Sequence, residues 1–177
     1  GDLAQSQEAH AACYITLAEQ AEPELYHHQQ RLWLAQLEQD HGNIHVALAY
    51  LQKHEEWIKL AQMIGTLGWF WYMHGILNEG RQWAEQAIAR GTDYLPESIR
   101  GKVISSAGVF AGFLGQNELA FIRCQESLPL CRASGDVRNL CASVYMLVHS
   151  LLAMKNALEA RQLAEETLAY AHALEDA

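Results

Sequence analysis

The chain has 177 residues, half of which are apolar, and its formal net charge is −9. Its twelve Lys and Arg residues are spread thinly without a basic cluster, which argues against direct binding to nucleic acid or to an anionic membrane. Alanine, leucine, glutamine and glutamate dominate and β-branched residues are scarce, so the composition favours helices.

Helical periodicity predicts three helices in the N-terminal third of the chain, and no alternating strand pattern competes with it. The expected helices cover residues 2–21, 26–40 and 43–54. We expect the first to end near Pro23, and Gly42 to form the turn between the second and the third.

Six more helices are predicted in the rest of the chain, at residues 55–74, 77–90, 97–114, 117–134, 137–154 and 157–174. The clearest loop is "RGTDYLPES" at residues 90–98, where either Pro96-Glu97 or Ser98 opens the sixth helix. Residues 60–78 carry no charged side chain, but Gln62, Thr66 and His74 favour a buried helix over a membrane span. The start of the chain, "GDLAQSQEAHAACY", has no basic segment followed by an apolar run, so we expect no secretory signal.

Small and turn residues recur at a spacing of 40 through the second half of the chain. They are Gly68, Gly108 and Val148 within the first helix of each pair, Gly75, Gly115 and Lys155 at the turns, and Gly80, Ala120 and Ala160 in the second helices. Short side chains at fixed positions let helix backbones approach closely. Charge-poor runs fall on the first helices, which indicates that these are sandwiched between neighbours in a stack.

The pattern therefore predicts an all-α superhelix of about nine helices, built from stacked antiparallel hairpins with repeats of ~40 residues. Three hairpins are expected at residues 55–90, 97–134 and 137–174, which together make up the segment 55–177. Residues 1–54 are expected to add N-terminal helices with a shorter first hairpin, and all of these helices are expected to form one continuous array.

Several segments resemble known helical repeats. The segment "AGVFAGFLGQNELAFIRCQESL" (residues 107–128) is similar to a tetratricopeptide hairpin. Four segments resemble, in the same order, the helical region of large bacterial signal-transduction ATPases of the AfsR-like and LuxR-type (MalT-like) regulator group: "HAACYITLAEQAEPEL", "LAQLEQDHGNIHVALAYL", "GWFWYMHGILNEGRQWAEQAIAR" and "ESLPLCRASGD". The resemblance covers almost the whole chain. It departs in the last hairpin, where Val148 and Lys155 stand in place of glycines.

The resemblance implies a cytoplasmic module of a bacterial transcription regulator that senses an inducer or binds a protein. Its neighbours would be the ATPase and DNA-binding domains of the full-length protein. The chain has no G-x-x-x-x-G-K-[ST] phosphate loop, so we expect it not to hydrolyse ATP. The alternative is a free-standing tetratricopeptide scaffold unrelated to transcription.

Neither a metal site nor a catalytic site is expected, and no cofactor is implied. His41 and His45 are four residues apart, but Gly42 lies between them and His41 is expected to precede its helix, so solvated turn histidines are the simpler interpretation. Cys124 and Cys131 lie two helical turns apart, too far for a disulfide, which predicts buried free thiols. The acidic residues lie mostly on outer helix faces, so we expect no enzyme activity.

The stretch "GWFWYMHG" (residues 68–75) places four aromatic residues in succession, and on a helix they point about 100° apart. We expect Phe70 and Trp71 to pack between helices. The repeat register predicts a concave face formed by Trp69, Tyr72, Met73, Phe113, Tyr145 and His149, with Ser105 and Gly112 beside them. Aromatic bodies with polar tips suit a protein segment or a small inducer. The alternative left open is that the N-terminal helix fills this face.

Overall fold

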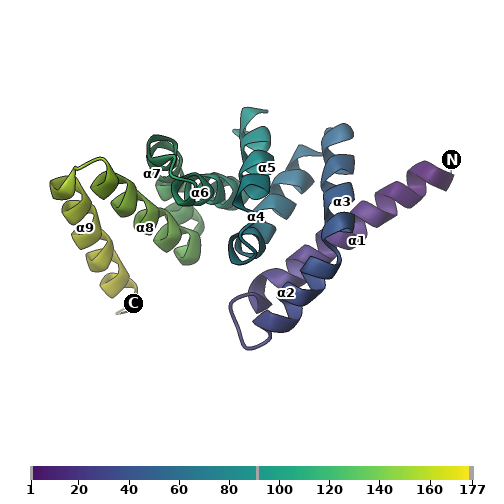
Figure 1. Ribbon diagram of the computed structural model, residues 1–177, viewed down its shortest axis with the longest axis horizontal. Helices are drawn as coiled ribbons and strands as arrows, with labels where there is room; N and C mark the ends of the chain where they lie inside the picture. The colour runs from purple at the N-terminus through teal and green to yellow at the C-terminus, as the bar shows by residue number, and fades with distance from the viewer. Residues whose placement is uncertain (1, 91, 176–177) are drawn as a thin grey trace. The chain divides into compact units, whose positions relative to one another are not determined.

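The computed structural model describes residues 2–90 and 92–175, and in these ranges the chain forms nine α-helices and no strand (Figure 1). The prediction of an all-α helical-repeat fold with about nine helices is confirmed. The chain divides into two compact units, which we call unit 1 (Gly1–Leu95) and unit 2 (Pro96–Ala177). The prediction of one continuous array with the segment boundaries given above stays a prediction.

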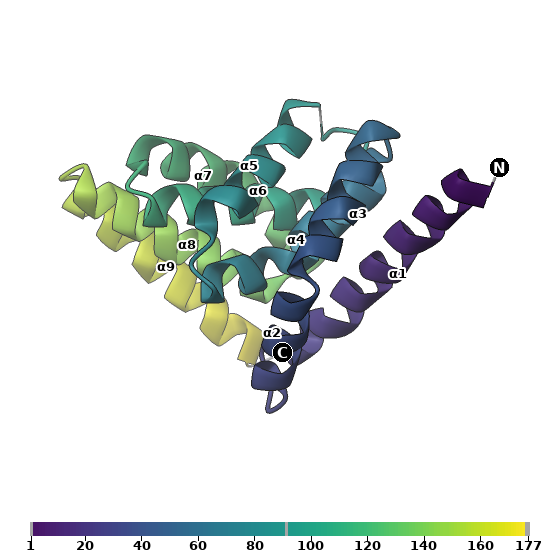
Figure 2. The same cartoon turned by 45° about the vertical axis from the view of Figure 1, so that its right-hand side comes forward.

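Unit 1 contains five helices: α1 (Asp2–Glu24), α2 (Gln30–Gln39), α3 (His41–Lys53), α4 (Trp57–Met73) and α5 (Leu77–Ala89). Helix α1 packs against α2, α3 and α4, while α4 also packs against α3 and α5. Figure 2 shows α1 beside α2 and α3, diverging from α3 toward its N-terminus. The long first helix therefore belongs to the packed body of unit 1 along its C-terminal part.

The predicted Gly42 turn is wrong. One residue, Asp40, separates α2 from α3, while Gly42 lies exposed in the first turn of α3. The Asp40 carboxylate accepts hydrogen bonds from Gln36, from the Tyr14 hydroxyl at 3.1 Å and from the Asn43 amide at 3.2 Å. These bonds, led by that from Gln36, lower the pKa of Asp40. The charged Asp40 carboxylate thus stabilises the junction between α2 and α3, where the sequence predicted a glycine turn.

Unit 2 contains α6 (Glu97–Phe113), α7 (Asn117–Ser134), α8 (Val137–Ala153) and α9 (Ala157–Glu175). Helix α6 packs against α7 and α8, and α8 packs against α7 and α9. A Cβ atom at Gly108 would lie 2.5 Å from the Cys124 sulfur and 3.0 Å from the Cys124 backbone nitrogen. Glycine at 108 therefore lets α6 and α7 approach closely.

A left-handed residue ends five of the helices and recurs at multiples of 20 residues. These residues are Glu55, Gly75, Gly115, Gly135 and Lys155, with φ between 58° and 78°. After each of them, the next backbone N–H donates to the carbonyl five residues earlier, over 2.8 to 3.1 Å. This is the hydrogen bond of a Schellman motif, which satisfies carbonyls at the helix end. Lys155 adopts the conformation of Gly75 and Gly115, so the turn register holds without glycine.

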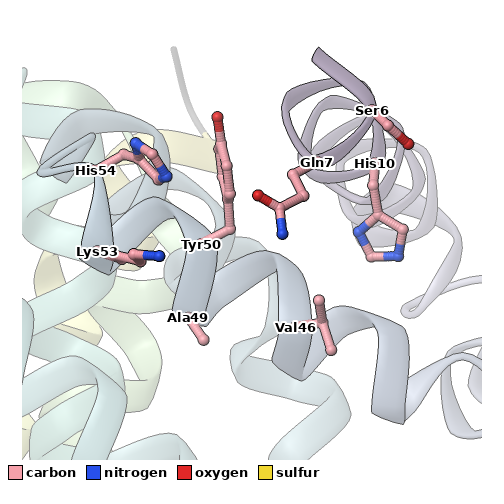
Figure 3. Close-up of a pocket in the computed structure, with 8 residues that line it drawn as sticks. All are labelled: Ser6, Gln7, His10, Val46, Ala49, Tyr50, Lys53 and His54. Atoms are coloured by element: carbon pink, nitrogen blue, oxygen red, sulfur yellow. The ribbon is translucent and has the colours of Figure 1, made fainter. Parts of the chain in front are cut away.

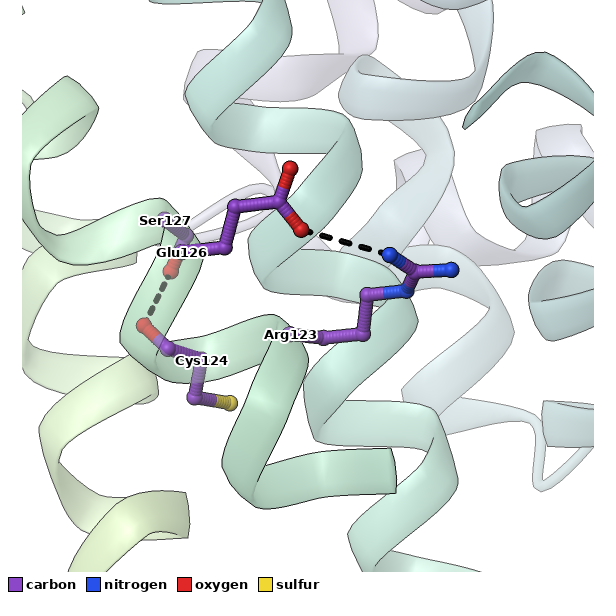
Figure 4. A network of polar contacts seen from close by, with 4 residues as sticks. All are labelled: Arg123, Cys124, Glu126 and Ser127. Carbon is purple, nitrogen blue, oxygen red and sulfur yellow. Dashed lines mark hydrogen bonds and ion pairs between the residues drawn. The ribbon is translucent and has the colours of Figure 1, made fainter. Parts of the chain in front are cut away.

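Three buried serines join α6, α7 and α8. The Ser143 hydroxyl lies 2.8 Å from that of Ser105 and 2.7 Å from that of Ser127, and none of the three residues is exposed. Ser127 also donates to the Cys124 carbonyl at 2.8 Å, beside an Arg123–Glu126 ion pair of 3.2 Å (Figure 4). A hydrogen-bonded hydroxyl network can be buried at low cost, whereas unpaired hydroxyls cannot.

The small residues of the second helices lie at buried positions, as predicted. Gly80 in α5, Ala120 in α7 and Ala160 in α9 are all buried. The charge-free run from residue 60 lies mostly within α4, whose inner residues are buried. Among the residues that the structure describes, no helix combines the length and hydropathy needed to span a membrane.

Candidate functional site

The six residues predicted to bind a partner form two sets. Trp69, Tyr72 and Met73 lie on α4 in unit 1. Phe113 ends α6, and Tyr145 and His149 lie on α8, all in unit 2. The structure brings residues together within each set.

In unit 1 the aromatic run of α4 divides between core and surface. Phe70 and Trp71 are 1% and 0% exposed, as predicted. Trp69 and Tyr72 are half-buried, and their ring centroids lie 5.1 Å apart. The Trp69 ring also lies 5.0 Å from the ring of Tyr26, in the turn after α1. We call Tyr26, Trp69 and Tyr72 the α4 aromatic cluster.

Two details distinguish this cluster from an ordinary core. The indole N–H of Trp69 is buried and has no hydrogen-bond acceptor among the described residues, a state that costs free energy. Met73, one residue beyond Tyr72, is exposed. The cluster therefore lies at the edge of the packed body, with part of its apolar surface accessible.

In unit 2 the predicted residues form a row of rings, which we call the aromatic ladder. The centroid of the Tyr145 ring lies 6.5 Å from that of the Phe113 ring and 6.5 Å from that of the His149 ring. The ring planes are tilted by 27° and 29° respectively, so the rings are nearly parallel. Tyr145 is 60% exposed and Phe113 is 43% exposed. Leu152, one turn farther along α8, extends the same exposed face.

Two residues expected beside this face are buried elsewhere, so their placement was wrong. Ser105 is fully buried in the serine network. Gly112 faces Met146 so closely that a Cβ atom there would lie 1.9 Å from the methionine sulfur. Both residues face α8 because small side chains on α6 allow close helix contact.

His41 and His45 contact different residues and form no shared site. His41 begins α3 instead of preceding it, and its Nε2 lies 3.0 Å from the Glu79 carboxylate. The His45 ring packs edge-on against Trp83 with centroids 5.5 Å apart. In the described part of the chain, no group of three or more His, Cys, Asp or Glu side chains is arranged to hold a metal ion.

The cysteines are free where the structure describes them, with Cys13 and Cys141 exposed and Cys124 and Cys131 buried. Burial raises the pKa of both buried thiols to about 12. They are therefore protonated near neutral pH and are poor nucleophiles.

Two adjoining pockets lie along α1 in unit 1. One, of about 330 Å³, lies between α1 and α3 and is shown in Figure 3. The other, of about 350 Å³, is lined by residues of α1, α3 and α4 and by Glu56. Tyr50 lines both. In unit 2 a smaller pocket of about 220 Å³ is lined by residues of α7, α8 and α9.

Sequence reasoning missed Tyr26 as a member of the α4 aromatic cluster. Tyr26 lies 43 residues before Trp69 and belongs to no repeat register, so no local pattern identifies the contact. Comparisons of the chain with protein-family models, with curated proteins and with solved structures find no match.

Proposed function

We propose that the chain is a helical-repeat interaction module whose aromatic ladder binds a segment of a partner protein. The observation that carries the proposal is the exposure of Tyr145, flanked by the rings of Phe113 and His149. Exposed apolar patches that join several elements often mark interaction sites. Here two helices, α6 and α8, contribute to one row of rings.

The chemistry of the ladder suits a peptide segment. Phe113 and Leu152 offer apolar surface, while Tyr145 and His149 add groups that hydrogen-bond. Tyrosine is enriched among residues that contribute most to protein binding, because a rigid ring buries a large area at small entropic cost. An apolar side chain of the partner, lying across the exposed edges of the rings, would gain most from this arrangement.

The α4 aromatic cluster is the second surface of the proposal. Tyr26, Trp69 and Tyr72 offer partly buried rings, and the exposed Met73 adds a flexible thioether beside them. A small inducer or a peptide side chain that supplies an acceptor to the Trp69 N–H would complete this cluster.

The proposal places the module in the cytoplasm, within a bacterial transcription regulator that carries ATPase and DNA-binding domains. Its support is the resemblance of four segments, in order, to the helical region of such regulators. The proposal assigns no catalytic chemistry to the module. Sequencing the whole gene tests this context: an upstream phosphate-loop module supports it, whereas an open reading frame of this length favours a free-standing scaffold.

Peptide selection tests binding at the ladder. A peptide selected on the wild-type chain from a displayed library should lose about tenfold or more in affinity on Tyr145→Ala, measured by calorimetry. Arg161→Ala is the matched control, because Arg161 lies exposed on α9 in an ion pair with Glu165. Equal losses in both variants, or none in Tyr145→Ala, would exclude the ladder as the binding surface.

A further inference from the structure

The pocket between α1 and α3 combines an apolar wall with a basic rim. Its volume is about 330 Å³, and its lining comes from the N-terminal part of α1 and the C-terminal part of α3 and the residue after it. The lining residues are Ser6, Gln7, His10, Val46, Ala49, Tyr50, Lys53 and His54. Figure 3 shows Gln7 reaching from α1 toward the ring of Tyr50. This volume is within the range of small-molecule sites.

The apolar wall is formed by α3. Val46 is 57% exposed although it lies beside α1, so its side chain offers accessible apolar surface in the pocket. The Tyr50 ring packs against the His54 ring with centroids 4.2 Å apart and the ring planes tilted by 32°. That contact orients the tyrosine ring and makes it a flat surface on which a planar ligand can stack.

The rim carries positive charge in a protein of net charge −9. Lys53 makes no ion pair with any described residue, and no carboxylate is among the described residues that line this pocket. His10 and His54 add ring nitrogens, and Gln7 and Ser6 add neutral hydrogen-bonding groups. Among the described lining residues, an anionic group therefore finds donors without a competing acid.

The adjoining pocket has the opposite charge balance. It is lined by the carboxylates of Glu8 and Glu56, and its one described cation, Lys59, is paired with Glu56 at 3.2 Å. Tyr50 lines both pockets and so lies where they meet. The two pockets are similar in volume, so charge and not size distinguishes them, and an anion is favoured in the pocket beside Lys53.

We propose that the pocket between α1 and α3 binds a small aromatic carboxylate. The ring of the ligand stacks on Tyr50 and covers Val46, and its carboxylate lies against Lys53, with Gln7 as a further donor. This site is separate from the aromatic ladder and from the α4 aromatic cluster, and it does not depend on the function proposed for them.

Indole-3-acetate and its neutral amide, indole-3-acetamide, form a matched pair of probes. Two-dimensional ¹H–¹⁵N NMR titration of the whole chain should show saturable shifts at α1 and α3 with the acid, with a Kd of about 1 mM or tighter for a ligand of this size. The amide, which keeps the ring and loses the charge, should bind about tenfold more weakly.

Variants separate the charge from the ring. Lys53→Gln should weaken binding of the acid about tenfold and leave binding of the amide unchanged, while Tyr50→Ala should weaken both. Lys59→Gln removes the same charge from the adjoining pocket and should change the affinity less than about twofold. Circular dichroism checks that each variant is folded.

The assignment would be overturned if indole-3-acetate showed no saturable binding, or if the acid and the amide bound with equal affinity. It would also be overturned if Lys53→Gln and Lys59→Gln lost equal affinity for the acid. Shifts confined to α6–α9 would equally place the ligand elsewhere.

Discussion

The two hairpins of unit 2 share one register but differ in how far their second helices are buried. In α7, Ala120, Cys124 and Leu128 are all buried. The equivalent positions of α9 are Ala160, which is buried, and Ala164 and Leu168, which are exposed. The shared register thus reproduces the contact at the start of the second helix, but not the burial farther along.

The first helices account for part of this difference. Helix α6 has Gly108 where α8 has Val148, and Gly108 brings the α6 backbone against Cys124. Helix α7 also lies against both α6 and α8, whereas in the described part of the chain α9 lies against α8. Close approach and a second neighbour both bury the middle of α7, and paired substitutions in the two hairpins separate these contributions.

The largest effect is expected from Gly108→Val, which places in α6 the residue that α8 carries. A Cβ at this position already meets the Cys124 backbone nitrogen at 3.0 Å, so the helices must separate. We expect a loss of about 3 kcal/mol in the free energy of unfolding of unit 2. Urea unfolding followed by circular dichroism measures it. All five tryptophans precede Leu95, so their fluorescence follows unit 1 as an internal control.

Val148→Gly is the reciprocal change. It removes packing from a half-buried site and adds a helical glycine, which together should cost about 1–2 kcal/mol. If Val148→Gly were the more damaging of the two, the account of the close α6–α7 approach would be wrong.

A medium effect is expected from Ser143→Ala, which tests the link between α8 and the hairpin formed by α6 and α7. The substitution removes the hydroxyl that lies between Ser105 and Ser127. Those two serines keep backbone acceptors, the Asn139 and Cys124 carbonyls, so the loss should stay near 1 kcal/mol. Thermal unfolding measures the change.

Thr167→Ala is the control in α9. Thr167 is at the position equivalent to Ser127, the member of the serine network on α7. The Thr167 hydroxyl bonds to the Leu163 carbonyl of its own helix at 2.8 Å. Its loss should therefore cost less than about 0.5 kcal/mol. Equal effects of Ser143→Ala and Thr167→Ala would show that the serine network contributes nothing beyond local bonds.

Small effects of opposite sign are expected at the equivalent turns. Gly115 has φ of 78°, so Gly115→Ala should cost about 1 kcal/mol and lower the melting temperature of unit 2 by about 5 °C. Lys155 has φ of 63°, so Lys155→Gly relieves strain and should stabilise by about 0.5 kcal/mol. Shifts of the same sign in calorimetry would contradict the shared turn conformation.

The fold could be predicted most closely where glycine and the repeat register agree. The bounds of α4 to α9 match the predicted ranges within two residues, because Gly75, Gly115 and Gly135 each take the left-handed conformation that ends a helix. Near the N-terminus the same logic failed. Gly42 is accommodated within a helix, and the Asp40 carboxylate holds the actual junction through bonds from three side chains.

The candidate surfaces were harder to predict because small residues are ambiguous. Ser105 and Gly112 lie at positions that suit either an inner face or a helix contact, and the structure assigns them to the contact. The burial of Phe70 and Trp71 followed from the repeat register, which assigned Trp69 and Tyr72 to a different face of the helix. The pocket between α1 and α3 had no sequence signal, since it depends on how α1 diverges from α3.

The spacing of the left-handed turns constrains how the chain length can change. Residues 116–155 run from just after the turn between α6 and α7 to the turn between α8 and α9, so duplication or deletion of this segment joins like conformations. Loss or gain of a single residue inside α8 would instead rotate every later side chain of that helix by about 100°. An insertion ahead of Tyr145 would turn it away from Phe113. Among homologous chains, length differences in this half should therefore occur in steps of forty residues or lie within loops.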